Sequence, residues 1–562
     1  MKKAISIGIQ GFSALREQDC FFVDKTNFIK EWWENRDVVT LITRPRRFGK
    51  TLNMSMLECF FSNKYANRAD LFEGLSIWQE EAYRKLQGSY PVIFLSFAAV
   101  KAGNLEDAKT QIKQEIARLY RENRNLMKED IFGEDERELY YQTTVKMDDV
   151  TVQDSLRNLS EWMERYYGKK VIILLDEYDT PMQEAYVQGY WDEFTAFVRS
   201  LFNASFKTNP YLERAIMTGI TRVSKESIFS DLNNLQVITT TSDLYADCFG
   251  FTESEVFHVL DEFGMGDKKN EVKQWYDGFT FGEHKDIYNP WSITNYLDKR
   301  KTYPYWASTS SNGLVSRLIR TASADVKEKM EDLLNGREIV VSFDEQIVYN
   351  QLDHNENAIW SLLLASGYLK VKHVDYRGIT REPWYTLDIT NIETLSMFTT
   401  MFQDWFQNQD ANYGYFMKAL INGDLEAMNY YMNKVALATF SYFDVGSGNG
   451  SDPEPERFYH GFVLGLIAER AGIYEIRSNR ESGFGRYDIM MIPQEREKYP
   501  AIIIEFKVCS RMKKETLEEA VQSALDQIVD KNYDAELLSQ GIAADRIRHY
   551  GFAFEGKRVL IG

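Results

Sequence analysis

Short apolar segments alternate with longer amphipathic segments along the first half of the chain. Aliphatic runs at 38–43, 91–99, 170–176 and 214–221 have the length and composition of buried strands. Charged stretches with helical spacing lie between them, and residues 105–123 are the clearest example. Strands that alternate with helices predict a parallel sheet covered by helices on both faces.

Beyond residue 250 the pattern predicts mainly helices. Residues 355–366 carry an apolar stripe typical of a helix, and the segments YLKVKHV and WYTLDI after it predict two strands around a polar turn. A helix followed by such a hairpin is compatible with a winged helix. It is also compatible with a linking subdomain that does not contact nucleic acid, and the sequence leaves both open.

A mixed pattern returns towards the C-terminus. The segment VGSGNGSDP at 445–453 is rich in Gly and Ser and predicts a flexible connector. After it we expect a helix at 453–470 capped by Asp452, strands at 473–478, 485–493 and 499–508, a helix at 514–530 and a last strand near 550–560.

The length of the chain requires several domains, because 562 residues are too many for one hydrophobic core. We expect an α/β fold class with a parallel-sheet N-terminal domain, a mostly helical middle region and a second α/β domain at the C-terminus. The expected segments are 1–250, 251–444, the connector 445–453, and 454–562.

Charge narrows the class of protein further. The formal net charge is −18, which argues against a protein that coats nucleic acid through bulk charge. Residues 451–562 are nearly neutral, with 16 Lys and Arg against 19 Asp and Glu, so a local basic groove stays compatible with the composition.

The sequence also predicts where the protein is found. No stretch approaches about 18 uninterrupted apolar residues, and residues 1–10 lack the apolar core of a signal peptide. The four cysteines form no CxxC pair, and the six histidines show no metal-ligand spacing. We therefore expect a cytoplasmic protein without a membrane span, zinc ribbon or disulfide framework.

A basic turn, RPRRFGKT, joins the strand at 38–43 to a helix, as a phosphate-binding loop requires. Lys50 would reach the β- and γ-phosphates of a nucleotide, and the Thr51 hydroxyl would ligate Mg²⁺. The match to GxxxxGK[ST] is partial, because Arg44 replaces the first glycine. The candidate nucleotide-binding residues of this turn are Arg44, Arg46, Arg47, Phe48, Gly49, Lys50 and Thr51.

Acidic and hydroxyl side chains follow two later strands. Asp176 ends the aliphatic run in LLDEYD, where a buried carboxylate needs a partner such as hydrated Mg²⁺. Glu177 is placed to polarise the attacking water. In TGITRVS, Thr218 or Thr221 is a candidate sensor of the γ-phosphate, and Arg222 a candidate charge sensor.

The segment AIIIEFKV carries the second set of candidate residues. Alternation places Glu505 and Lys507 on the same face of the strand. A sharp turn would pair this strand with GRYDIMM and bring Asp488 beside Glu505. Two such carboxylates can hold Mg²⁺, with Lys507 orienting the attacking water. Glu456 would complete the metal shell, and Gln527 would support the site from the following helix.

The segments RPRRFGKT, LLDEYD, TGITRVSKESIFSDLNN and WYDGF together resemble the AAA-ATPase-like family of P-loop proteins that are fused to a PD-(D/E)xK nuclease. This resemblance covers roughly residues 5–300. The loop of the family reads RPRRFGK[ST], which implies that Arg44 is a family trait.

The segments SNRESGFGRYDIM and ALDQIVDKNY resemble the C-terminal nuclease domain of the same family, over roughly residues 450–550. The expected order of helix, three strands, helix and strand is that of the PD-(D/E)xK core, a restriction-endonuclease-like fold. Tyr487 stands where the family label has a proline. The resemblance implies catalytic roles for Asp488, Glu505 and Lys507, and it extends to Glu456 and Gln527.

The leading hypothesis is an ATP-dependent nuclease that acts on DNA, with ATP and Mg²⁺ as cofactors and Mn²⁺ as a substitute at the nuclease site. A second hypothesis is an NTP-controlled switch or nucleic-acid-binding module with an inactive nuclease fold. A third, by fold-level analogy, is a signalling ATPase in defence or mobile-element biology. The sequence leaves open DNA versus RNA, homo-oligomerisation through the ATPase domain, and whether the loop arginines act within one chain or across a subunit interface.

Overall fold

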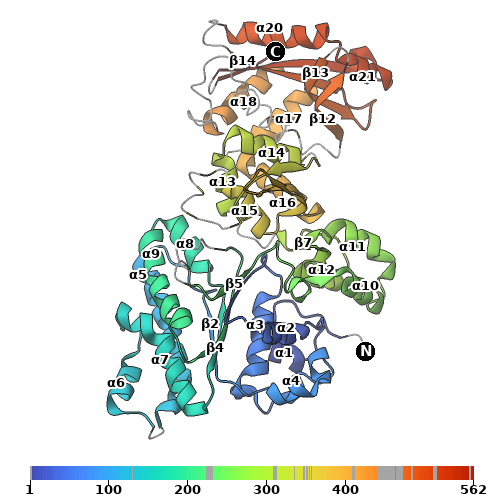
Figure 1. The fold of residues 1–562 in the computed structure, drawn as a ribbon. Coiled ribbons are helices and arrows are strands. Elements are labelled where there is room, and N and C mark those ends of the chain that lie inside the picture. Colours follow the sequence, from blue (N-terminus) through green and yellow to red (C-terminus); the bar gives the residue numbers. More distant parts are fainter. Residues whose placement is uncertain are drawn as a thin grey trace. The chain divides into compact units, whose positions relative to one another are not determined.

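The computed structural model divides into two compact units, Met1–Leu318 with Glu338–Leu395, and Ile319–Arg337 with Ser396–Gly562 (Figure 1). It describes residues 3–128, 131–222, 229, 232–307, 313–334, 336–345, 349, 352, 355, 357–407, 412–439, 463, 467, 473–482, 485–509, 515–555 and 558–562. The predicted segment borders at residue 250 and at 445–453 stay predictions, and the connector lies outside the described residues.

The first unit is built on a five-stranded parallel sheet in the order β2-β3-β4-β1-β5. Its strands are β1 Val39–Thr43, β2 Val92–Ser96, β3 Val171–Asp176, β4 Leu212–Gly219 and β5 Leu235–Ile238. Every residue of β1 and β3 is buried, as expected for central strands covered on both faces. The predicted parallel α/β fold of this region is confirmed.

Helices cover both faces of this sheet (Figure 1). One face carries α1 Phe12–Glu17, α2 Asn27–Asn35, α3 Lys50–Phe61 and α4 Glu81–Leu86. The other carries α5 Leu105–Glu122, α6 Glu134–Gln142, α7 Asp149–Tyr167, α8 Thr180–Gln188 and α9 Trp191–Phe202. The ends of α7 follow from local sequence, since the Asp148 side chain accepts a hydrogen bond from the Thr151 amide and Gly168 ends the helix in the left-handed region.

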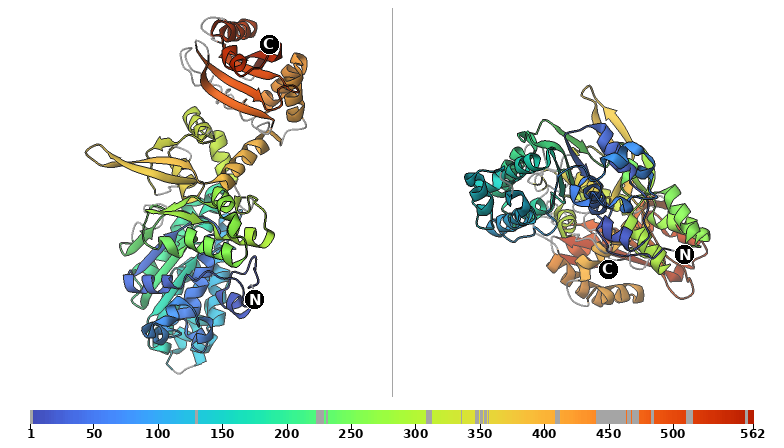
Figure 2. Two further views of the ribbon diagram at one scale, coloured as in Figure 1. Left: turned by 90° about the vertical axis from the view of Figure 1, so that its right-hand side faces the viewer. Right: turned by 90° about the horizontal axis from the view of Figure 1, so that it is seen from below.

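Two small three-stranded sheets complete the first unit. One, in the order β6-β8-β7, contains β6 Phe251–Thr252, β7 Phe279–Phe281 and β8 His284–Tyr288, beside α10 Glu253–Glu262, α11 Lys269–Tyr276 and α12 Pro290–Lys299. The other, in the order β10-β11-β9, contains β9 Ile339–Val341, β10 Leu369–Arg377 and β11 Glu382–Ile389 (Figure 2). Strands of two to five residues are too short to show an alternating pattern of apolar and polar residues in the sequence. The prediction of a mainly helical region therefore missed β6 to β9.

The helix α15, Ala358–Ala365, precedes the β10–β11 hairpin, so both predicted elements after residue 355 are confirmed. Its side chains from Ala358 to Leu364 are all buried. It therefore has no face on which a nucleic acid could bind. The winged-helix interpretation stays a prediction, and contact through an exposed helix is excluded for this element.

The second unit holds a five-stranded mixed sheet in the order β12-β13-β14-β15-β16. Its strands are β12 Tyr474–Ser482, β13 Gly485–Pro493, β14 Ala501–Val508, β15 Ile547–Glu555 and β16 Arg558–Ile561. Helices α20 Leu517–Asp530 and α21 Asp534–Ser539 pack on one face, and α17 Asn412–Asn422 and α18 Leu425–Thr439 on the other. The division between the units falls within α13 Gly313–Thr321 and α16 Ile392–Gln407, and α14 Ala324–Leu334 belongs to the second unit.

The structure corrects two details of the C-terminal prediction. The single strand expected near 550–560 is two antiparallel strands, β15 and β16. The polar stretch EGKR at 555–558 separates two apolar runs and is the turn signal that the prediction of one strand overlooked. The strands β13 and β14 are joined by residues 494–500, so the expected sharp turn is wrong. The predicted helix at 453–470, with its cap Asp452, lies outside the described residues apart from the buried Val463 and Ile467. None of the helices in the described ranges combines the length and apolarity needed to cross a membrane.

A buried carboxylate joins three parts of the first unit. Glu393, in the first turn of α16, accepts hydrogen bonds from the Ser292 hydroxyl at 2.8 Å and from the Trp306 amide at 2.6 Å. The side chain is fully buried, and this burial raises its pKa from 4.5 to about 7. The folded protein therefore binds this proton more tightly than the unfolded chain does.

We predict that Glu393→Gln removes a pH dependence of stability. In the wild type, the free energy of unfolding should decrease as the pH rises from about 4.5 to about 7, by up to about 3 kcal/mol for this group. The amide keeps an acceptor for Trp306 and cannot ionise, so the variant should gain stability relative to the wild type over this range. Urea unfolding at pH values across it measures the difference, with the exposed Glu81→Gln as control. A difference between Glu393→Gln and wild type that does not change with pH would contradict the assignment.

Candidate nucleotide site and candidate metal centre

The turn between β1 and α3 has the backbone of a phosphate-binding loop. Residues 44–49 connect the strand to the helix, and Arg47 and Gly49 both have positive φ, at +66° and +80°. The left-handed conformation at Gly49 brings the chain directly into the first turn of α3, whose amide groups are free to bind an anion.

The side chain of Lys50 lies inside this loop. Its ammonium group is buried and donates hydrogen bonds to the carbonyls of Arg44 at 2.9 Å and Pro45 at 2.8 Å. Burial lowers the pKa of Lys50 to about 8, opposed chiefly by the negative charge of Glu177. The loop thus folds around its own lysine.

Two strands and the helix α3 bring hydroxyl and carboxylate groups together beside Lys50. The Asp176 carboxylate, at the end of β3, accepts hydrogen bonds from the hydroxyls of Thr51 at 2.8 Å and Thr218 at 2.5 Å. Burial raises the pKa of Asp176, with the neighbouring charge of Glu177 adding to the effect. An oxygen cluster of this kind fits Mg²⁺, because Thr51 and Asp176 are the ligand types that hold it beside a phosphate-binding loop.

Glu177 follows Asp176 in a strained conformation. Its φ is +53°, an uncommon value for a residue with a side chain, and such strain concentrates at functional sites. The Thr180 hydroxyl donates to its carboxylate at 3.2 Å. The predicted base therefore lies next to the Asp176 cluster.

The three arginines of the loop lie in three different environments. Arg44 is fully buried, and its guanidinium donates to the carbonyls of Thr43 at 3.0 Å and Thr239 at 2.5 Å. Burial lowers its pKa to about 9. Arg47 instead places its guanidinium 4.3 Å from the ring of Trp291.

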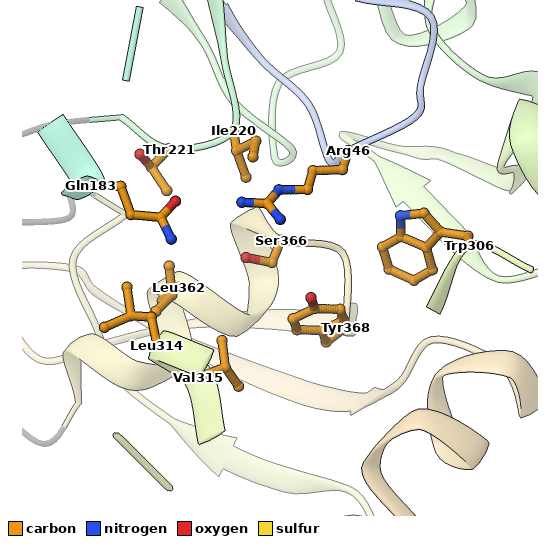
Figure 3. Close-up of a pocket in the computed structure, with 10 residues that line it drawn as sticks. All are labelled: Arg46, Gln183, Ile220, Thr221, Trp306, Leu314, Val315, Leu362, Ser366 and Tyr368. Atoms are coloured by element: carbon orange, nitrogen blue, oxygen red, sulfur yellow. The ribbon is translucent and has the colours of Figure 1, made fainter. Parts of the chain in front are cut away.

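Arg46 alone points into a cavity next to the loop (Figure 3). The cavity measures ≈ 30 Å³, room for about one water molecule. Hydroxyl and amide groups of Gln183, Thr221, Ser366 and Tyr368 line it, and the guanidinium of Arg46 lies among them. Phe48, the remaining candidate of the loop, packs edge-on against Phe279 and Phe281.

The structure separates the candidate sensors. Thr218 reaches the Asp176 cluster, and Thr221 lines the Arg46 cavity. Arg222 lines a different cavity of ≈ 170 Å³ with Phe229 and other apolar residues, so the structure does not bring it to Asp176.

Sequence reasoning missed Asp179, the last acid of LLDEYD. Its carboxylate is buried and accepts from the Ile220 amide at 2.9 Å, and from the amide and hydroxyl of Thr221 at 2.7 and 2.8 Å. A Cβ at Gly219 would approach this carboxylate to 2.7 Å, so only glycine fits there. The sequence did contain a signal for Asp179. LLDEYD has three acids in six residues, and the roles expected from the motif used only two of them.

In the second unit, Asp488 and Glu505 meet where β13 and β14 separate. The ladder between the strands ends at the pair Ile489 and Ile504, and the carboxylate of Asp488 then accepts the amide of Phe506 at 2.8 Å. Glu505 is 2% exposed, and burial together with the charge of Asp488 raises its pKa to about 8. Two carboxylates are therefore held close together, and that of Glu505 is shielded from water while Asp488 is half-buried.

Lys507 and Gln527 hold one oxygen of Glu505. The Lys507 ammonium lies 3.5 Å from Oε1, and the Gln527 amide from α20 donates to the same oxygen. The other oxygen, Oε2, is buried and has no hydrogen-bond partner among the described residues. A buried carboxylate oxygen without a donor, beside a second carboxylate, fits a divalent cation.

The described residues supply two acidic ligands for such a cation. Within the ranges that the structure covers, no group of three or more His, Cys, Asp or Glu side chains has metal-binding geometry. Glu456, the predicted third ligand, lies outside those ranges.

Tyr533 is a further residue that the sequence reasoning did not assign. Its buried hydroxyl accepts from the Gln527 amide at 3.2 Å and donates to the Arg486 carbonyl at 2.6 Å. It therefore links the residue that holds Glu505 to the strand that carries Asp488. The signal was present in ALDQIVDKNY, where the tyrosine follows the glutamine in the same segment.

Comparisons with known proteins agree with this geometry. Residues 6–229 match a family described as predicted AAA-ATPase, and residues 454–562 match the PD-(D/E)XK nuclease superfamily. A relative from Azotobacter chroococcum mcd 1, described as an uncharacterized protein in the vnfD 5′ region, is 27% identical over 395 residues, which is 70% of this chain and 68% of the relative. The resemblance to an AAA-ATPase-like protein with a C-terminal PD-(D/E)xK nuclease domain is confirmed.

We predict that Tyr533→Phe weakens metal binding by roughly 10- to 100-fold, because Gln527 loses its support and Glu505 its fixed orientation. Mn²⁺ affinity measured by calorimetry checks this. Tyr550→Phe is the matched control, since its hydroxyl also donates to a buried carbonyl, that of Leu420, from a strand of the same sheet. Equal Mn²⁺ affinity in Tyr533→Phe and Tyr550→Phe would refute a positioning role.

Proposed function

We propose that this protein binds and hydrolyses ATP in its first unit and cleaves DNA with a metal-dependent nuclease in its second, under the control of the nucleotide. The observation that carries the proposal is the pair of Asp488 and Glu505, with a buried carboxylate oxygen that has no donor among the described residues. The matches to the AAA-ATPase-like and PD-(D/E)XK families support both activities at the level of domain class.

At the nucleotide site, Lys50 would move from the carbonyls of Arg44 and Pro45 to the β- and γ-phosphates. Thr51 and Asp176 would hold Mg²⁺, which neutralises phosphate charge when it is bound. Glu177 would accept a proton from the attacking water, and Thr218 would report the presence of the γ-phosphate through its bond to Asp176.

Arg46 would stabilise the charge that develops during hydrolysis, and it would act within its own chain. Arg44 and Arg47 are engaged elsewhere, by carbonyls and by the Trp291 ring. Arg46 has no carboxylate partner among the described residues and points into a cavity that Thr221 also lines. A guanidinium placed in advance beside the phosphates is effective in catalysis, because it needs no reorganisation when charge develops.

At the nuclease site, Asp488 and Glu505 would hold Mg²⁺ or Mn²⁺, which lowers the pKa of a bound water and stabilises charge on the scissile phosphate. Lys507 would orient the attacking water from its position beside Glu505. Gln527 would keep Glu505 in place, and Glu456 would add a third carboxylate.

A contact in the first unit would respond to nucleotide binding, that of Pro45 with Gly367. Lys50 binds the Pro45 carbonyl, and a Cβ at Gly367 would lie 2.7 Å from the Pro45 ring. Gly367 lies in the turn between α15 and β10. When Lys50 leaves the Pro45 carbonyl to bind phosphate, a shift of Pro45 would be transmitted to this turn through the contact between the Pro45 ring and Gly367.

A second candidate function is an NTP-controlled switch with an inactive nuclease fold. It applies if Asp488 and Glu505 hold no metal, because the described part of the chain brings no third metal-binding side chain to this pair. Metal titration separates the two proposals, because an inactive site need not bind Mg²⁺ or Mn²⁺.

We predict that Arg46→Ala lowers the kcat of ATP hydrolysis by about 10²-fold or more, with little change in ATP affinity. Arg47→Ala, which removes the neighbouring arginine of the same loop, should retain most of the rate. Lys50→Ala should abolish nucleotide binding. Steady-state hydrolysis and equilibrium nucleotide binding measure these effects. Equal kcat values for the two arginine variants would refute the role of Arg46.

The proposed nuclease is tested by incubating the protein with plasmid DNA and Mg²⁺ or Mn²⁺, with and without ATP. We expect cleavage by the wild type, none by Asp488→Ala or Glu505→Ala, and a rate that depends on ATP. Cleavage by Asp488→Ala at the wild-type rate would refute the site. Absence of cleavage together with absence of metal binding would favour the switch.

A further inference from the structure

The carboxylate of Asp179 does not cap the helix that it precedes. Asp179 is the N-cap residue of α8, a position where aspartate usually accepts a hydrogen bond from an amide of its own helix, but its side chain makes no such bond. The carboxylate instead contacts Ile220 and Thr221, which directly follow β4. The last acid of LLDEYD therefore joins two segments that lie about forty residues apart in the chain.

One oxygen of this carboxylate holds the segment after β4. Oδ2 of Asp179 accepts hydrogen bonds from the Ile220 amide at 2.9 Å and from the amide and hydroxyl of Thr221 at 2.7 and 2.8 Å. Hydrogen bonds to a charged acceptor are about twice as strong as those between neutral groups. The carboxylate is also buried, so water does not compete for these donors. Asp179 thus fixes both the backbone and the side chain of Thr221.

The same segment also contacts the phosphate-binding loop. The Arg44 amide of the loop donates to the Gly219 carbonyl at 3.1 Å, and the Tyr178 hydroxyl donates to the Thr221 carbonyl at 2.8 Å. A Cβ at Gly219 would lie 2.7 Å from Oδ1 of Asp179, so the backbone and the carboxylate are in close contact. The segment after β4 therefore lies between the end of LLDEYD and the loop, in contact with both.

Two residues of this segment form part of the wall of the cavity that Arg46 enters (Figure 3). Ile220 and Thr221 line this cavity together with the guanidinium of Arg46. The cavity measures ≈ 30 Å³, so the guanidinium has little free space around it. Closely packed side chains transmit a displacement to their neighbours. A shift of Ile220 and Thr221 would therefore change the position of Arg46.

We propose that Asp179 is a positioning residue for ATP hydrolysis. By fixing Ile220 and Thr221, it holds Arg46 where the guanidinium stabilises the charge that develops on the phosphates. This role rests on the proposed ATPase activity and on the proposed role of Arg46, and it assigns the residue that keeps Arg46 in place. Asp179 acts through Arg46 and does not touch the nucleotide. Its loss should therefore lower the rate of hydrolysis and leave nucleotide binding by Lys50 and the loop intact.

The test measures ATP hydrolysis and equilibrium ADP binding by the full chain. Asp179→Asn keeps the size of the side chain, but an amide oxygen is neutral and has two lone pairs for the three donors that Oδ2 accepts. We expect Asp179→Asn to lower kcat about 10-fold, and Asp179→Ala to lower it further, while ADP affinity changes by less than about 3-fold.

Asp24→Asn is the matched control. The Asp24 carboxylate also accepts hydrogen bonds from backbone amides and hydroxyls in the same unit, those of Thr26 and Ser76. It lies outside the loop and the cavity, so kcat in Asp24→Asn should stay within about 2-fold of wild type. If Asp179→Ala does not fold, the comparison of Asp179→Asn with Asp24→Asn decides alone.

A second background tests the route through Arg46. Arg46→Ala lacks the guanidinium that Asp179 is proposed to hold. In this background, Asp179→Asn should lower kcat by no more than about 2-fold, because residues that act through one another are not additive. A loss as large as in the wild-type background would show that Asp179 acts independently of Arg46, and this would overturn the positioning role.

Two further outcomes would overturn it: equal kcat values for Asp179→Asn and Asp24→Asn, or an ADP affinity that falls as much as kcat does. The proposed ATPase fails in a different way. A wild-type chain that neither binds nor hydrolyses ATP refutes the ATPase and the role of Asp179 with it. A wild-type chain that hydrolyses ATP at a rate unchanged by Asp179→Asn refutes only the role of Asp179.

Discussion

Two hydrogen bonds from a buried ammonium group determine the resting conformation of the phosphate-binding loop. Lys50 is enclosed by the protein, and a buried charge without partners would cost several kcal/mol. The carbonyls of Arg44 and Pro45 supply those partners, so the loop closes on the lysine. The positions of Arg46, of the Pro45 ring against Gly367, and of the Thr51 hydroxyl beside Asp176 all depend on this closed loop.

The same constraint, with the opposite sign of charge, organises the candidate metal centre in the second unit. Glu505 is buried, and Lys507 and Gln527 compensate only one of its oxygens. The second oxygen and the adjacent Asp488 keep a negative field that favours a cation. Tyr533 holds the two strands at this spacing through Gln527 and the Arg486 carbonyl. Each site is thus a buried charge that the fold compensates incompletely, and a ligand of opposite charge would complete it.

Arginine has four different roles in the first unit, although the residue type is the same. Arg44 is an internal support bonded to carbonyls, and Arg47 packs on Trp291. Arg46 points into a small cavity lined by polar and apolar side chains, and the exposed Arg377 stacks on Trp384. Local backbone and neighbours decide between these roles. A guanidinium is costly to bury without acceptors, and it is available to an anion only where acceptors are missing.

The sequence by itself determined the fold class and the strands β1 to β4 and β10 to β14. It also determined Lys50, Thr51, Asp176, Asp488 and Glu505 as candidates, because periodicity and residue chemistry are local properties. It could not determine that Thr218 reaches Asp176 while Arg222 does not, or that Tyr533 supports Gln527. It also could not show that every side chain of α15 from Ala358 to Leu364 is buried. These facts depend on contacts between residues far apart in the chain, and only the packing of strands and helices in three dimensions decides them.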